Sequence, residues 1–349
     1  MAMPIVDLPR PVVGGVDTHL DVHVAAVVDV IGGVLGVASF PVDRAGYAAL
    51  VSWMTGFGTV DRVGIEGTGS YGAGLSRYFT SAGIAVIEVD RPNRQERRRN
   101  GKSDELDAIE AARAALSGRA RGRAKGRGGN VEAIRALLVA KRSARSARIS
   151  SIVQLRHLMF TAPDDVRARF ARLRPEALVR ETARLRPRAE TDAVRHATKT
   201  TAVILARRVQ AFDDEIALLE RQIAPLVKAT GPALLDIYGA GVDTAATLLV
   251  AAGDNSERIR SEAAWAKLCG VSPVPANTGK RDNRYRLNHG GNRHANNALW
   301  HIVFTRLGQH EPRTVAYMQR RLAQGRTKPE IIRCLKRYVA RETFSALPR

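Results

Sequence analysis

The sequence predicts three parts: an α/β domain, a middle region of long helices, and a mostly helical C-terminal region. From about residue 11 to 127, β-branched runs bounded by turn residues alternate with amphipathic helical patterns. From 128 to 230 the chain has few helix breakers, and its apolar residues recur at helical spacing. We therefore expect domains at 11–127, 128–230 and 231–349, with the middle one forming a coiled-coil hairpin.

The elements of the first domain can be assigned in chain order. Ser103 is a suitable N-cap for the last helix, because its hydroxyl can accept a backbone hydrogen bond and acidic residues follow in the first turn. A basic run containing proline and glycine precedes this helix and predicts a loop. The expected segments are strands within 12–30, 34–43, 63–70 and 84–90, helices near 45–54 and 74–81, the loop at 91–102, and the helix from 103.

Glycines mark the boundaries beyond this domain. Residues 119–129 are basic and low in complexity, which predicts a flexible domain boundary that contacts phosphate or solvent. Later, two apolar helical segments meet at Gly239 and Gly241. This arrangement resembles a helix-hairpin-helix, in which glycines let backbone N–H groups approach a phosphate, and a plain helix turn is the alternative. The segment 328–347 predicts an amphipathic helix with a basic face.

The charge of the chain indicates a polyanionic partner. Lysine and arginine number 55 against 34 acidic residues, giving a formal net charge of +21. Nucleic acid fits this surplus best, because each neutralised phosphate releases a counterion. The chain has no apolar run long enough to span a bilayer and no signal-peptide pattern at its start, so we expect a cytoplasmic protein that does not bind membranes. The two cysteines have no zinc-ribbon or disulfide spacing.

Four acidic residues of the first domain form a candidate metal site. Asp17 and Glu66 each end a predicted strand, and Asp104 and Asp107 are three residues apart, so they share one face of a helix start. Phosphodiester cleavage is accelerated by two divalent cations, and Mg²⁺ takes carboxylate oxygens as ligands. Taken singly, each acid is better explained as a turn residue or a helix-dipole partner. Together, in an α/β domain, they match the layout of a ribonuclease-H-like nuclease.

Two further acids compete for places in this set. Asp21 lies four residues beyond Asp17, and Asp90 ends the strand that precedes the basic loop. Either could replace a member if the strand register differs from the one expected.

Three short motifs carry a family resemblance. The blocks GVDTHLDVH, GIEGTGSYG and KSDELDA, in this order, resemble the DEDD recombinases of the IS110 family of insertion sequences, which includes the Piv-type DNA invertases. The resemblance implies a RuvC-like domain whose metal site, for Mg²⁺ or Mn²⁺, consists of Asp17, Glu66, Asp104 and Asp107. The last motif usually reads K-T-D-x-x-D-A, and here Ser103 replaces the threonine.

A second constellation lies in the C-terminal region, where a hydroxyl stands among cations. A hydroxyl in such a setting can attack a phosphate, although a basic loop that only binds the DNA or RNA backbone is the simpler interpretation. The candidate nucleic-acid-binding residues of the whole chain are Arg97, Arg98, Arg99, Lys102, Gly239, Gly241, Gly279, Lys280, Arg281, Arg284, Arg286, Asn292 and Arg293.

The family resemblance assigns the hydroxyl a role. In IS110-type enzymes, a serine directly before a glycine is a nucleophile that bonds to DNA, and the position here is Thr278. A threonine keeps the oxygen but adds a methyl group that restricts χ1 and crowds in-line attack. The segment from Gly290 to Arg293 corresponds to a glycine-asparagine-arginine element near that site, which we expect to contact phosphate.

The predicted function is therefore that of a transposase and site-specific recombinase that cuts and rejoins DNA to move its own element. The resemblance implies donor and target DNA as substrates and a noncoding bridge RNA as guide. Because strand exchange needs two duplexes, we expect a homo-oligomer (a dimer or tetramer), and we also expect association with the nucleoid. Two rivals remain. A Piv-like invertase would have the same sites, and a catalytically weakened nucleic-acid-binding remnant would be consistent with Thr278.

Overall fold

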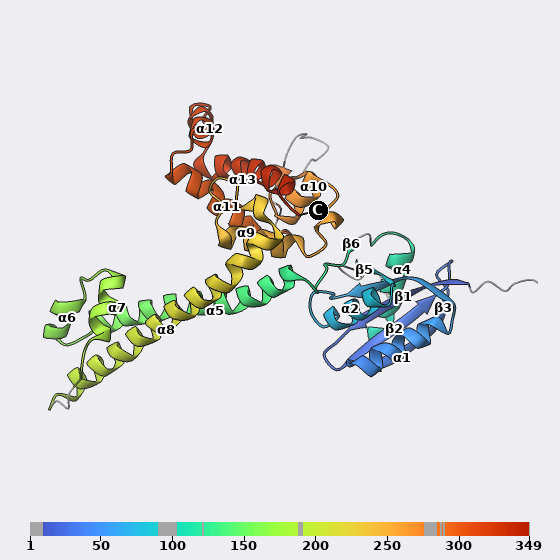
Figure 1. The fold of residues 1–349 in the computed structure, drawn as a ribbon, viewed down its shortest axis with the longest axis horizontal. Coiled ribbons are helices and arrows are strands. Elements are labelled where there is room, and N and C mark those ends of the chain that lie inside the picture. The colour runs from blue at the N-terminus through green and yellow to red at the C-terminus, as the bar shows by residue number, and fades with distance from the viewer. Residues whose placement is uncertain are drawn as a thin grey trace, which may run out of the picture. The chain divides into compact units, whose positions relative to one another are not determined.

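The computed structural model divides into two compact units (Figure 1). The N-terminal unit comprises Met1–Gly129 together with Ala252–Arg260 and Arg349, and the C-terminal unit comprises Asn130–Ala251 and Ser261–Pro348. The residues that the structure describes are 10–89, 103–120, 122–187, 191–275, 285–286, 288 and 290–348.

A mixed six-stranded sheet forms the centre of the N-terminal unit. Its strand order is β3-β2-β1-β4-β5-β6, with β1, β4 and β5 parallel and the other neighbours antiparallel. This mixed α/β architecture is consistent with the predicted ribonuclease-H-like fold. The elements are β1 (Pro11–Thr18), β2 (Val22–Val28), β3 (Val34–Pro41), α1 (Arg44–Thr55), β4 (Thr59–Glu66), α2 (Ala73–Ser81), β5 (Ala85–Val89), α4 (Asp104–Leu116) and β6 (Gly122–Arg123).

Different helices cover the two faces of this sheet. Helices α1 and α2 cover one face, where the core contains Val16, Leu50, Ile65 and Phe79, all fully buried. Helix α4 packs on the other face through alanines, among them Ala112. Strand residues alternate between these faces, so the side chains at every second position point to the same helices.

The segment 119–129 was expected to be a flexible boundary, but part of it pairs with the sheet. Gly122–Arg123 forms the edge strand β6, which pairs antiparallel with β5. Asn255, which comes from much later in the chain, also holds this segment. Its side chain donates to Ala124 O at 2.9 Å and accepts from the N–H of Gly126 at 2.7 Å. A general basic composition does not reveal such a specific contact.

Two long helices dominate the first half of the C-terminal unit, α5 (Asn130–Phe160) and α8 (Ala193–Thr230), which lie side by side in Figure 1. Two short helices, α6 (Asp164–Phe170) and α7 (Pro175–Ala183), connect them. Leu155, Phe170, Leu178 and Ala206 belong to the buried core that joins all four helices. The expected long helices are present, and the short connecting pair was not expected.

The rest of the C-terminal unit is mostly helical. Trp265 is fully buried, and its indole N–H donates to Thr343 Oγ1 at 3.0 Å, which ties α10 to α13. Its elements are η1 (Pro232–Leu234), α9 (Val242–Ala252), α10 (Glu262–Leu268), β7 (Val274–Pro275), β8 (Tyr285–Arg286), α11 (Arg293–Gly308), α12 (Pro312–Ala323) and α13 (Lys328–Ser345). The 3-10 helix η2 (Ser256–Arg258) belongs to the N-terminal unit. Within the described ranges, no helix combines the length and apolarity that a membrane crossing requires.

The turn around Gly239 differs from the expected pair of helices. Between the end of α8 and the start of α9 the chain forms only the three-residue 3-10 helix η1 and turns. Gly239 has a φ of +85°, a conformation that other residues seldom adopt. The first of the two expected helical segments is thus reduced to one short 3-10 helix, and the helix-hairpin-helix likeness stays a prediction.

Candidate metal centre

Two glycines bring helix α4 close to the sheet and fix which strand residues face it. A Cβ on Gly15 would lie 2.2 Å from Ala108 O and from the Ala112 nitrogen, and one on Gly64 would lie 2.3 Å from Ala111 O. The backbones of β1 and β4 therefore touch the backbone of α4, which no larger residue would permit.

The alternation of side chains along β1 and β4 directs two acids to the sheet face that α4 covers. Asp17 is two residues after Gly15 on β1, and Glu66 is two residues after Gly64 on β4, so both side chains project toward α4. The strands are parallel neighbours, with Val16 opposite Ile65, and the Thr18 hydroxyl donates to Glu66 O at 2.8 Å. Asp17 and Glu66 consequently lie at the same end of these two neighbouring strands.

Helix α4 begins near that end of the strands and contributes the other two acids. Ser103 caps the helix by accepting from the Leu106 N–H, as the sequence predicted. Asp104 is half-exposed in the first turn, whereas Asp107 is buried on the face that meets the sheet. The backbone N–H groups of this first turn favour negative charge nearby, so the start of α4 is a suitable place for two aspartates.

The electrostatics of Asp17 show that three of the carboxyl groups interact. Asp17 is only 7% exposed, and burial raises its pKa above the usual value. The charges of Asp107 and Asp104 raise that pKa further, while the charge of His19 opposes the rise. A bound cation would relieve this repulsion between carboxylates, so the cluster is suited to hold one.

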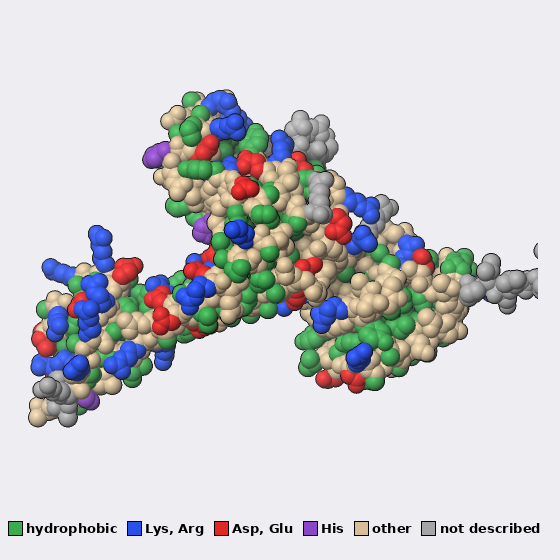
Figure 2. Space-filling view, in the orientation of Figure 1, with side chains coloured by type: hydrophobic (Ala, Val, Ile, Leu, Met, Phe, Trp, Pro, Cys, Tyr) green, Lys and Arg blue, Asp and Glu red, His purple; other side chains and the backbone are tan. Residues whose placement is uncertain are grey.

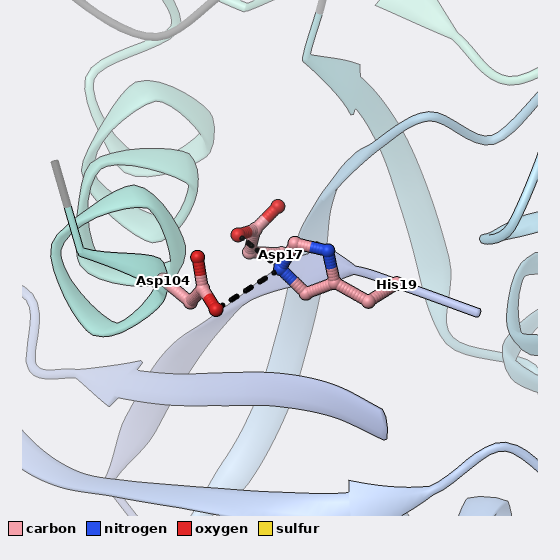
Figure 3. A group of neighbouring side chains, drawn as sticks. All are labelled: Asp17, His19 and Asp104. Carbon is pink, nitrogen blue, oxygen red and sulfur yellow. Dashed lines mark ion pairs between the residues drawn. The ribbon is translucent and has the colours of Figure 1, made fainter. Parts of the chain in front are cut away.

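His19 is the residue of this site that the sequence interpretation missed. Its Nε2 lies 3.1 Å from Asp17 Oδ2 and 3.2 Å from Asp104 Oδ2, so the ring stands between the two carboxylates (Figure 3). The available signal was the spacing Asp-x-His at the end of a strand, since residues two apart lie on one side of an extended chain.

The donor set fits a divalent cation. One ligand atom from each of Asp17, His19 and Asp104 can be chosen so that all three lie within 4.8 Å of one another. Carboxylate oxygens suit Mg²⁺ and Mn²⁺, and imidazole suits transition metals. Glu66, half-buried on the neighbouring strand, and the buried Asp107 complete the acidic surroundings. Of the rivals, Asp21 is exposed in the turn after β1, and Asp90 lies outside the described residues.

Two family models match this chain. One, named for the DEDD transposases of IS110 and described as "Transposase", matches residues 14–162 and so includes the acidic cluster. The other, described as "Transposase IS116/IS110/IS902 family", matches residues 231–319. The chain belongs to the IS110 family of transposases. This confirms the family that the three sequence motifs predicted.

A curated relative supports the same family. The IS110-family chain is 30% identical over 145 residues to a protein from Streptomyces coelicolor that is named the uncharacterized 43.6 kDa protein of insertion element IS110. The matched stretch is 41% of this chain and 35% of the relative, so the similarity spans about a third of the relative's length.

The C-terminal candidate residues of this IS110-family transposase are described only in part. Nine of the candidates lie outside the described residues. They are Thr278, Gly279, Lys280, Arg281 and Arg284 of this region, and Arg97, Arg98, Arg99 and Lys102 of the earlier basic loop. Arg286 is exposed on β8, and Gly241 directly precedes α9, where its N–H donates to Thr244 Oγ1 at 2.9 Å.

The segment from Gly290 to Arg293 has a structural role, and its expected contact with phosphate stays a prediction. Asn292 is the N-cap of α11, because its side chain accepts from the Ala295 N–H at 3.0 Å. A Cβ on Gly291 would lie 2.2 Å from the Gly270 Cα, so this backbone crosses another one closely. Arg293 begins the helix and is exposed. The glycine and the asparagine thus place Arg293 at the surface, where a phosphate can reach it.

Proposed function

We propose that this IS110-family transposase cuts and rejoins DNA strands with the help of divalent cations held by Asp17, Glu66, Asp104 and Asp107. The observation that supports the proposal is the electrostatic contact of Asp17 on β1 with Asp104 and Asp107 at the start of α4, while Glu66 ends the neighbouring parallel strand. Mg²⁺ or Mn²⁺ bound there would neutralise charge on the scissile phosphate and activate a hydroxyl.

The chain's own groups would position the DNA in this reaction. Asp17 and Asp107 are buried and fixed by the close strand–helix contact, so their oxygens have little freedom to move. Asp104 is half-exposed, so a phosphate in solution could reach its carboxylate.

Thr278 is proposed as the group that bonds covalently to DNA. Its hydroxyl oxygen would attack the phosphorus, form a threonine–phosphate ester, and release the other strand end as a hydroxyl that takes up the proton. This proposal rests on the family resemblance around Thr278. Arg286 and Arg293 would bind the neighbouring phosphates, as arginine does through its planar fork of N–H donors.

A noncoding bridge RNA is the proposed guide, and donor and target DNA are the proposed substrates, bound by a dimer or tetramer. The basic surface at the α6–α7 end of the long helices supports a nucleic-acid partner, since Lys and Arg side chains gather there in Figure 2. The exposed arginines of this region are Arg167, Arg169, Arg172, Arg174, Arg180, Arg184 and Arg186. Such a surface binds phosphate backbones independently of base sequence.

Strand cleavage by the full-length protein tests the proposal. The protein would be incubated with element-end DNA, the structured RNA transcribed beside the element, and Mg²⁺. We expect breaks in the wild type and at least a hundredfold fewer with Asp17→Asn, which keeps the shape but removes the charge. The matched control is Asp21→Asn, which alters an exposed acid in the following turn and should cleave normally. Binding without breaks in the wild type would contradict the proposal.

Thr278 is tested separately with nicked DNA that traps a covalent intermediate. A protein–DNA adduct should form in the wild type and with Thr278→Ser, and should be absent with Thr278→Ala. Adduct formation by the alanine variant would remove Thr278 as the nucleophile without affecting the metal site.

A further inference from the structure

The surroundings of His19 set it apart from an ordinary surface histidine. Its side chain is 41% exposed as a whole, yet the Nε2 atom is shielded from solvent. This nitrogen points into the space between the Asp17 and Asp104 carboxylates, at nearly equal distances of 3.1 and 3.2 Å (Figure 3). The imidazole therefore approaches the acidic cluster by one specific atom.

A simple hydrogen bond does not explain this placement. His19 shares a side-chain hydrogen bond with Asp17, yet the same Nε2 lies almost as close to Asp104, at 3.2 Å. A single N–H can be aimed at one acceptor only, and a nitrogen lone pair that faces two carboxylates is repelled by them. A cation bound between the three groups would satisfy all of them together.

The spacing of the three atoms fits such a cation. Ligands about 2.1 to 2.2 Å from an octahedral metal and adjacent to each other are about 3 Å apart. The two Nε2-to-oxygen distances, 3.1 and 3.2 Å, agree with that spacing. His19 Nε2 is therefore already at the separation from each carboxylate that neighbouring ligands of one ion require.

We propose that His19 is a nitrogen ligand of the metal centre and that it makes this centre prefer Mn²⁺ over Mg²⁺. The inference rests on the proposed function, because it assumes the acidic metal site described above. Imidazole nitrogen binds first-row transition metals well, whereas Mg²⁺ strongly favours oxygen ligands and retains its water. A site with two carboxylates and one imidazole should thus discriminate between the two ions, and a site made of carboxylates alone would not.

Metal binding by the full-length protein, without nucleic acid, provides the test. Mn²⁺ and Mg²⁺ affinities would be measured by calorimetry for the wild type and for His19→Ala. We expect the variant to bind Mn²⁺ about 10- to 100-fold more weakly and Mg²⁺ less than about threefold more weakly. The matched control is His157→Ala, which removes an exposed imidazole of α5 and should leave both affinities unchanged.

Pulsed electron paramagnetic resonance of bound Mn²⁺ distinguishes a ligand role of His19 from a merely structural one. The wild type should show coupling of the Mn²⁺ electron spin to a ¹⁴N nucleus, and His19→Ala should lose it. Bound Mn²⁺ without nitrogen coupling in the wild type would overturn the proposal. So would equal Mn²⁺ affinity in the wild type and the variant, provided that circular dichroism shows both to be folded.

A third variant separates this inference from the proposed function. If Asp17→Asn abolishes Mn²⁺ binding while His19→Ala has no effect, the acidic metal site stands and His19 is not its ligand. If neither substitution weakens Mn²⁺ binding, the ion binds elsewhere, and both the metal site of the proposed function and the role of His19 are wrong.

Discussion

The two faces of the six-stranded sheet are built in opposite ways. On the α1–α2 face, large side chains such as Leu50 and Phe79 fill the space between helix and strand. On the α4 face, glycines and alanines bring the helix backbone directly onto β1 and β4. The α1–α2 face buries large apolar side chains. The α4 face has small residues, so the helix approaches closely and carboxyl groups from strand and helix lie near one another.

This difference teaches how stability and function are distributed in the N-terminal unit. Large buried side chains contribute most of the apolar area removed from water, so the α1–α2 face should dominate the free energy of unfolding. The α4 face should dominate metal binding, because backbone contact fixes the positions of Asp17 and Asp107. Five substitutions, one of them a matched control, test this division.

The largest effect is expected for Gly15→Ala. The added methyl group would lie 2.2 Å from two backbone atoms of α4, which cannot move aside as a flexible side chain can. We expect the free energy of unfolding to fall by about 4 kcal/mol and metal affinity to be lost, because α4 must move away from the sheet. Chemical denaturation and calorimetry with Mn²⁺ measure the two effects.

The neighbouring glycine provides a matched control. A methyl group on Gly14 points to the opposite face, where it meets the flexible Met54 side chain at 2.8 Å. Gly14→Ala should cost about 1 kcal/mol and leave metal affinity unchanged. Equal effects of the two substitutions would show that the faces do not differ as described.

The next largest effect is expected for Leu50→Ala on the α1–α2 face. Leu50 is fully buried, so the substitution should lower the free energy of unfolding by about 3 kcal/mol through lost burial and a cavity. Metal affinity, measured well below the melting temperature, should remain within about twofold of the wild type. A large loss of affinity in the folded variant would mean that the two faces are coupled.

A pH-dependent effect is expected from His23, which lies on the α1–α2 face against Tyr47 with ring centroids 5.8 Å apart. Burial, aided by the charge of His19, lowers the pKa of His23 to about 4. The unfolded chain takes up this proton near its ordinary pKa of 6.5, so stability is complete above that pH and falls as the pH drops toward 4. The loss should reach at most about 3 kcal/mol.

Denaturation curves between pH 4 and 7 measure this dependence. His23→Phe keeps a planar ring beside Tyr47 and removes the titrating group. Its stability should therefore decline less than that of the wild type over the same interval. Parallel curves for the two proteins would exclude His23 as the source of the pH dependence.

The smallest effect is expected for Ser103→Ala at the start of α4. Loss of the cap hydrogen bond to Leu106 should cost about 1 kcal/mol. Metal affinity should fall only slightly, since the glycine contacts still hold the helix. A loss of affinity as large as that of Gly15→Ala would show that the cap, rather than the backbone contact, positions the acids.

The sequence predicted the main elements of the α/β unit because their signals are local. Alternating β-branched runs marked the strands, and Ser103 with its acidic followers marked the start of α4. The strand β6 was missed because two residues of a basic, glycine-rich segment carry no strand pattern. The contact of Asn255 with residues 124 and 126 is equally invisible, since it joins positions about 130 apart in the chain.

The sequence singled out the acids of the candidate site and not its histidine. Asp17, Glu66 and the α4 aspartates stand at recognisable ends of strands and helix, whereas His19 follows the last residue of β1 and resembles a turn residue. The glycines two residues before Asp17 and Glu66 were a stronger signal than the interpretation used. They place each acid on the face where a helix can approach closely.

The most direct test of the convergence of the acids is the location of bound Mn²⁺ by anomalous diffraction from crystals of the full chain. We predict ions bounded by oxygens of Asp17, Glu66, Asp104 and Asp107, on the α4 face of the sheet. Mn²⁺ bound away from Asp17 and Asp107, or those two carboxylates occupying separate sites, would contradict the account.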